Sequence, residues 1–298
     1  MTTPRFGRLL TAMVTPFQAD GSINFDVAIE LATYLVGEGC DGLVIAGSTG
    51  EGSSLSDKEK LELFACVAGA VEVPVLAGST FADTARSVDL TRQVLETGVS
   101  GVLATTPAYA RPSQKGIAAH FAAIANATEL PIMLYDIPIR TGRKIAASTV
   151  IDLVSSHSNI VAIKDASGDL VSAAHYKSVL GDDIDLYSGD DSVILPFMGV
   201  GAVGLVSVAA HWAAREFVGL IDSAVRGDWT QARAFNERLA TSYAFETSDL
   251  YPNPMPSKAA LRYLGFDVGQ CRLPHAESDD TLDADAAKVV AALQASRG

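Results

Sequence analysis

The sequence repeats one unit eight times: a short apolar run that ends in polar or glycine residues, followed by a stretch whose apolar residues have helical spacing. Nearly every position in each run is apolar, which is typical of parallel strands covered on both faces. The runs span residues 9–17, 42–50, 74–80, 101–107, 131–138, 160–166, 184–190 and 202–208. Eight such units predict an α/β fold, a (β/α)8 TIM barrel. A doubly wound sheet is the alternative, and it is disfavoured because no GxGxxG follows a strand.

The stretches between the runs carry recognisable helix ends. Ser56 and Glu59 have the spacing of a capping box, in which each side chain satisfies an exposed backbone amide of the other residue. Asp83 is a predicted N-cap for the next helix, which Gly98 should end. These signals support helices between the strands.

The pattern changes at Gly227. Beyond it, apolar residues recur only at helical spacing and no strand-like run follows. We therefore predict a barrel catalytic domain over residues 1–226 and a C-terminal helical extension of about three helices over residues 227–298.

Charge and composition exclude several classes of function. The net charge of −13 and the pI near 4.7 disfavour nucleic acid as a partner, because phosphate binding needs a surplus of Lys and Arg. No apolar run approaches the roughly 20 residues of a membrane helix. The N-terminus is too short and polar for a signal sequence, and the three cysteines form no CxxC pair, so we expect a cytoplasmic protein. The five histidines show no HxH or HExxH spacing, and no metal site is expected.

In a TIM barrel the active site lies at the carboxyl ends of the strands. Lys164 ends the segment NIVAIK (159–164), so its stem should lie against the barrel wall and its amine should point into the mouth. Burial disfavours the ammonium form and lowers the pKa, and a neutral amine can attack a carbonyl. The alternative is a structural lysine paired with a carboxylate such as Asp165.

Other polar residues follow the predicted strands. Tyr135 could transfer protons. Ser48 and Thr49, in the Gly47–Glu51 turn, could receive a carboxylate. Arg140, expected on a loop, could bind a second carboxylate with its two-pronged guanidinium. Each is commonly structural when taken singly, so their combination carries the argument.

Together the motifs resemble those of the dihydrodipicolinate synthase/N-acetylneuraminate lyase family. The resemblance spans most of the chain, and its segments occur in the family's order. They are GSTGE (47–51), TTPAYARPSQ (105–114), YDIPIRTG (135–142), IKDASGDL (163–170), YSGDD (187–191) and PNPMPSKAAL (252–261).

The resemblance implies class I aldolase chemistry with no cofactor. Lys164 would form an imine with pyruvate, and Tyr135 would transfer protons. Ser48 would belong to a hydroxyl relay and, with Thr49, would hold the pyruvate carboxylate. Tyr109 would complete that relay in the neighbouring subunit of a homotetramer built as a dimer of dimers.

The resemblance also implies how a second substrate would bind. Arg140 would bind the carboxylate of aspartate semialdehyde, and the backbone around Gly189 and Val206 would line the pocket. Arg140 favours the synthase branch, which condenses these two substrates in lysine and diaminopimelate biosynthesis. Because Ala108 replaces a tyrosine used in feedback control, we expect weak or absent inhibition by lysine.

Two alternatives stay open. One is another pyruvate-dependent aldolase of this fold, which cleaves sialic acid or a 2-keto-3-deoxy sugar acid. It draws support from Ser48, which the lyases use where synthases commonly have Thr. The pair of Arg140 and Ile139 suits a short acid better than these polyhydroxylated substrates, although Ile139 replaces the Gly or Ser that synthases often have before the arginine. The other is a non-catalytic barrel that only binds keto acids.

Overall fold

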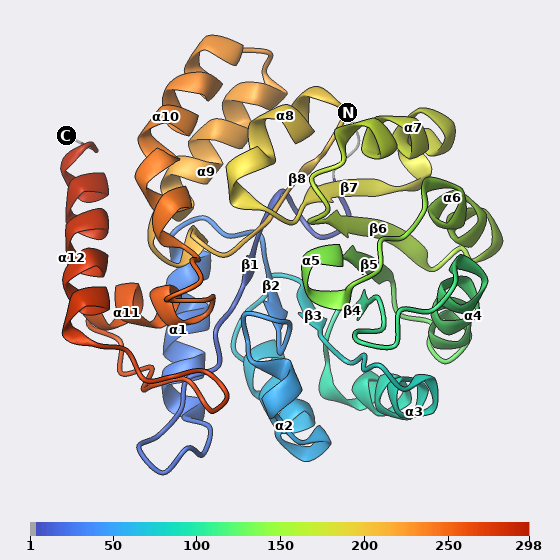
Figure 1. Cartoon of the computed structure of the whole chain (residues 1–298), viewed down its shortest axis with the longest axis horizontal. Coiled ribbons are helices and arrows are strands. Elements are labelled where there is room, and N and C mark those ends of the chain that lie inside the picture. Colours follow the sequence, from blue (N-terminus) through green and yellow to red (C-terminus); the bar gives the residue numbers. More distant parts are fainter. Residues whose placement is uncertain (1–3, 298) are drawn as a thin grey trace.

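The computed structural model describes residues 4–297 and contains a closed barrel of eight parallel strands in sequential order (Figure 1). The predicted TIM barrel is confirmed. Each strand lies within one of the eight apolar runs, and the last strand closes the barrel on the first. The strands are β1 (Leu9–Ala12), β2 (Gly42–Ile45), β3 (Val75–Ala77), β4 (Gly101–Thr105), β5 (Ile132–Asp136), β6 (Ile160–Asp165), β7 (Asp185–Ser188) and β8 (Gly204–Ser207).

Two hydrophobic clusters explain why the runs are apolar at every position. Alternate strand residues, such as Leu10, Val44 and Val206, point into the barrel and form one cluster. Their neighbours, such as Leu9 and Leu43, point outward and pack with the surrounding helices in the other. Both faces of the sheet are therefore buried, as the parallel arrangement requires.

A ring of helices surrounds the strands (Figure 1). They are α1 (Phe25–Gly37), α2 (Asp57–Ala68), α3 (Thr84–Val94), α4 (Gln114–Ala125), α6 (Ala147–Ser156), α7 (Leu170–Leu180), α8 (Ile194–Gly199) and α9 (Ala210–Val225). The short helix α5 (Pro138–Thr141) follows β5 and lies inside this ring (Figure 1). Short 3-10 turns complete the connections: η1 (Gly52–Ser54), η2 (Leu95–Thr97), η3 (Gly181–Asp183) and η4 (Asp191–Val193).

The predicted helix ends are confirmed. The Ser56 side chain accepts from the amide of Glu59 at 3.2 Å, and Glu59 accepts from the amide of Ser56 at 2.8 Å. Asp83 caps α3 by accepting from the amide of Arg86 at 2.7 Å. Gly98 follows η2 with a positive φ of 78°, a conformation that glycine adopts without a steric cost.

Three helices form the C-terminal extension, as predicted: α10 (Trp229–Phe245), α11 (Met255–Tyr263) and α12 (Asp280–Ala295). Figure 1 shows them in orange and red on one side of the barrel. The indole of Trp212, on α9, donates to the hydroxyl of Ser242, on α10, at 3.1 Å. The proposed division after residue 226 falls between α9 and α10 and stays a prediction. None of the helices within residues 4–297 has the length and apolar composition needed to cross a bilayer.

Candidate active site

Lys164 lies near the end of β6, and only 4% of its surface is exposed. Burial lowers the pKa of its amine to about 8, an effect that the charge of Asp191 opposes and that of Arg140 reinforces. The nitrogen lies 4.3 Å from the centre of the Tyr135 ring. Within residues 4–297 no carboxylate forms an ion pair with it. The ion pair with Asp165 or another carboxylate that the structural alternative requires is therefore absent from the described residues.

Asp165 has other partners. It accepts from the hydroxyls of Ser167 at 2.7 Å and Tyr176 at 2.8 Å. These bonds hold the residue that follows Lys164 in the chain. Lys164 itself lines a cavity, which is described below.

Tyr135 is the neighbour of Lys164 in the pairing of β5 with β6. Burial raises the pKa of its phenol to about 12, while Arg140 and the Ser48 hydroxyl partly oppose the shift. The phenol is therefore protonated at neutral pH. It can donate a proton to an oxygen bound near Lys164.

The lysine, the tyrosine and the turn after β2 line one cavity of about 290 Å³. Ser48, Thr49, Arg140 and Gly189 contribute to its wall, so six of the eight predicted site residues meet there. A Cβ atom at Gly189 would lie 2.9 Å from Cγ of Lys164. Glycine at this position therefore leaves room for the lysine stem.

The other two predicted residues lie outside this lining. Val206 is fully buried in the barrel interior, and the β8 side of the cavity is lined by Val208 instead. Tyr109 has a positive φ of 67° and is 97% exposed in the single chain.

Arg140 lies in the short helix α5 and not on an irregular loop, which corrects the sequence-based expectation. Pro138, at the first turn of this helix, supplies a backbone angle that suits a helix start. The guanidinium donates to the carbonyl of Asn253 at 3.3 Å. Within residues 4–297 it forms no ion pair, so it remains available to an anionic ligand.

Sequence reasoning missed the cavity residues Asp191, Glu246 and Asn253. Asp191 accepts from the hydroxyl of Ser207 and from the amide of Val208 at 2.8 Å. Burial raises the pKa of the carboxyl groups of Asp191 and Glu246, and the charge of Asp191 raises the pKa of Glu246 further. Asn253 lies in the PNP segment that contributed to the family resemblance, but Glu246 has no comparable sequence signal.

The described part of the chain, residues 4–297, contains no cluster of three or more His, Cys, Asp or Glu residues arranged to hold a metal ion. The groups that line the cavity include the amine of Lys164, the phenol of Tyr135, the hydroxyls of Ser48 and Thr49 and the guanidinium of Arg140, beside the carboxyl and amide groups named above. This set can form an imine and bind carboxylates.

The comparison with protein families matches residues 5–294 to the Dihydrodipicolinate synthetase family. A 4-hydroxy-tetrahydrodipicolinate synthase of Desulforamulus reducens is 43% identical over 280 residues, covering 93% of this chain and 94% of that protein. One of Mycobacterium leprae is 45% identical over 287 residues, with 94% of each chain covered. The crystal structure of the Cyanidioschyzon merolae enzyme with lysine bound has a TM-score of 0.94 at 39% identity, covering 97% of this chain and 98% of that one. The chain belongs to the dihydrodipicolinate synthetase family.

Proposed function

We propose that the chain is a 4-hydroxy-tetrahydrodipicolinate synthase, which condenses pyruvate with aspartate semialdehyde through a Schiff base on Lys164. The observation that carries the proposal is the buried amine of Lys164, which has no ion-pair partner among residues 4–297 and lies next to the phenol of Tyr135 in a cavity with carboxylate-binding groups. Relatives of that name at 43–45% identity support the substrates.

The chemistry begins with the neutral amine of Lys164, which attacks the keto carbon of pyruvate and forms a carbinolamine. Tyr135 donates a proton to the departing hydroxyl, and water leaves to give the iminium. The iminium draws electrons from the neighbouring methyl group, and the phenolate left on Tyr135 takes a proton from that methyl group to give an enamine. The enamine carbon then attacks the aldehyde of the second substrate. Attack of that substrate's amino group on the imine carbon closes the ring and releases the lysine.

Two groups of side chains bind the substrate carboxylates in this proposal. Ser48 and Thr49 hold the carboxylate of pyruvate, and the backbone at Gly189 forms another part of the cavity wall. Arg140 binds the carboxylate of aspartate semialdehyde. Val206 supports the end of β8 from inside the barrel.

We further propose that Tyr109 enters the site of a second subunit and completes a hydroxyl relay with Ser48 and Tyr135. Its 97% exposure in the single chain supports this role, because a large aromatic side chain gains by burial in an interface. The assembly would be a homotetramer of two dimers. The free thiols of Cys40, Cys66 and Cys271 are in keeping with a cytoplasmic location.

Steady-state assays with the two substrates test the proposal, with N-acetylneuraminate as the competing substrate. The wild type should condense pyruvate with aspartate semialdehyde and should not cleave N-acetylneuraminate. Arg140→Ala should lower kcat/KM for the semialdehyde about a hundred-fold and keep imine formation with pyruvate. Equal use of the semialdehyde by both proteins would contradict the assignment to the synthase.

A further inference from the structure

The C-terminal extension reaches the turn that carries Ser48 and Thr49. Lys258, on α11, forms an ion pair with Glu51 at 2.8 Å, and the two side chains are 1% and 0% exposed. An ion pair that is fully removed from water is costly to break, because the remaining charge would lose its partner. The last residue of the Gly47–Glu51 turn is therefore fixed to the extension.

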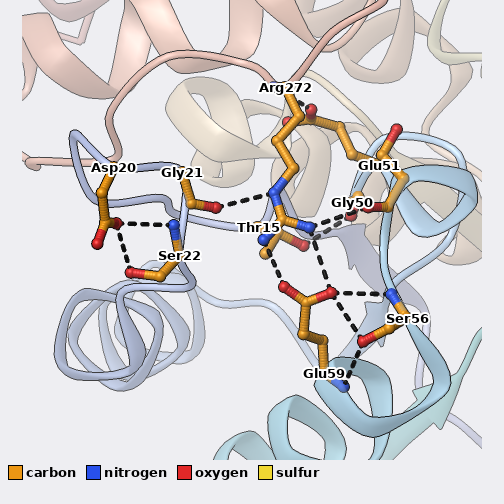
Figure 2. Close-up of polar contacts among 10 residues, drawn as sticks. Thr15, Asp20, Gly21, Ser22, Gly50, Glu51, Ser56, Glu59 and Arg272 are labelled. Carbon is orange, nitrogen blue, oxygen red and sulfur yellow. Dashed lines mark hydrogen bonds and ion pairs between the residues drawn. The ribbon is translucent and has the colours of Figure 1, made fainter.

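Arg272 ties the extension to the same region a second time. Its backbone amide donates to Glu51 at 2.8 Å, and its guanidinium donates to the carbonyls of Gly21 at 2.9 Å and Ser54 at 2.9 Å and also pairs with Glu59. Figure 2 shows Arg272 between Gly21, Glu51 and Glu59. The Arg272 side chain thus connects the loop at Gly21, the 3-10 turn η1 at Ser54 and the helix α2 at Glu59.

Asn253 makes the contact closest to the chemistry. Its side-chain NH2 donates to the hydroxyl oxygen of Thr49 at 3.0 Å, across 204 residues of sequence. Since the Thr49 oxygen accepts this bond, the single proton of the hydroxyl is free to point elsewhere. Both residues line the cavity, so a ligand carboxylate can accept that proton.

Asn253 also has an unused acceptor. Only 8% of the residue is exposed, and its side-chain oxygen is buried without a hydrogen-bond partner among residues 4–297. Its backbone carbonyl accepts from Arg140 at 3.3 Å. Asn253 therefore lies between the hydroxyl assigned to pyruvate and the guanidinium assigned to the second substrate.

We propose that Asn253 is a positioning residue of the carboxylate site, which orients the Thr49 hydroxyl as a donor toward pyruvate. The Lys258–Glu51 and Arg272–Glu51 contacts hold the extension against the turn so that this bond forms. The inference rests on the proposed function and deepens it, because it makes the extension a part of the pyruvate site.

The test measures how trapping of the lysine imine with borohydride depends on pyruvate concentration. Asn253→Ala removes the donor and should raise the half-saturating pyruvate concentration about ten-fold, with full trapping at saturation. Asn253→Asp has nearly the same shape but replaces the donor with a charged acceptor that repels a carboxylate. It should raise the half-saturating concentration about a hundred-fold.

Arg262→Met is the matched control, because Arg262 pairs with Asp283 inside the extension and does not contact the turn. It should lower the melting temperature and leave the pyruvate dependence unchanged. If Asn253→Asp does not fold, the result for Asn253→Ala decides the test. A half-saturating concentration equal to that of the wild type in the folded Asn253 variants would overturn this inference alone. Failure to trap the wild type would overturn the proposed function and the inference with it.

Discussion

Lys164 can attack a carbonyl only while its amine is neutral, so its pKa decides how fast the imine forms. At an ordinary pKa the neutral fraction at pH 7 is on the order of one part in a few thousand, whereas at a pKa of about 8 it is about one tenth. The rate of imine formation at low pyruvate should therefore rise with pH and level off above about pH 8. Stopped-flow or quenched trapping of the imine, repeated from pH 7 to pH 10, measures how the rate depends on pH. A rate that keeps rising toward pH 10 would show an amine with an ordinary pKa.

The space beside Lys164 gives a second prediction at the residue scale. The Cβ of Gly189→Ala would meet Cγ of Lys164 at 2.9 Å, so the stem must shift, and misplacing a reacting group by about 1 Å can cost a hundred-fold in rate. We expect the variant to form the imine about a hundred-fold more slowly. Gly199→Ala is the control, because its Cβ would meet no atom within 4 Å. Equal rates in both variants would show that Gly189 does not position the lysine.

Residues at strand ends could be predicted from the sequence, because the barrel places them at one mouth whatever the details of the loops. Lys164, Tyr135 and Thr49 were identified in this way. Asn253 and Glu246 could not be placed in the cavity from the strand pattern, since they reach it from the connection between α10 and α11, whose packing on the barrel the strand pattern does not determine.

At the scale of elements, the apolar runs locate every strand, but they extend beyond it. The run at 42–50 contains only a four-residue strand, β2 (Gly42–Ile45). Its remaining residues turn away from the sheet to form most of the Gly47–Glu51 turn. Hydrophobicity alone does not distinguish a buried strand from the buried turn that follows it.

The cap of α3 gives a stability prediction. Asp83→Ala removes the acceptor for the amide of Arg86 and should lower the free energy of unfolding by about 1 kcal/mol. Asp182→Ala, at an exposed position in η3, should change it by less than about 0.5 kcal/mol. Urea unfolding followed by circular dichroism measures both. Equal losses would mean that the Asp83 cap contributes nothing beyond an exposed carboxylate.

The segment after the Gly47–Glu51 turn also bears on regulation. Lys60, on α2, is buried and donates to the carbonyl of Gly78 at 3.2 Å. It lines a second cavity of about 400 Å³ with Gly52, Ser53 and Ala108. A buried ammonium group there would repel the amine of free lysine, so weak or absent inhibition by lysine stays our prediction.

At the scale of the whole molecule, the proposed exchange of Tyr109 between subunits predicts complementation. In a mixed dimer of Lys164→Ala and Tyr109→Phe chains, one site loses both groups and the other keeps both. Each variant alone should be at least about a hundred-fold less active than the wild type. Unfolding and refolding an equal mixture should restore about one quarter of wild-type activity, since half of the dimers are mixed and each has one intact site. No recovery in mixtures that assemble would place Tyr109 outside the partner's site.

The most direct measurement of the central claim is the mass of the peptide that contains Lys164 after borohydride reduction with pyruvate. The account predicts a stable adduct of reduced pyruvate on Lys164, formed by the wild type and absent from Lys164→Ala. An unmodified Lys164, or an adduct on another lysine such as Lys60 or Lys258, would contradict it.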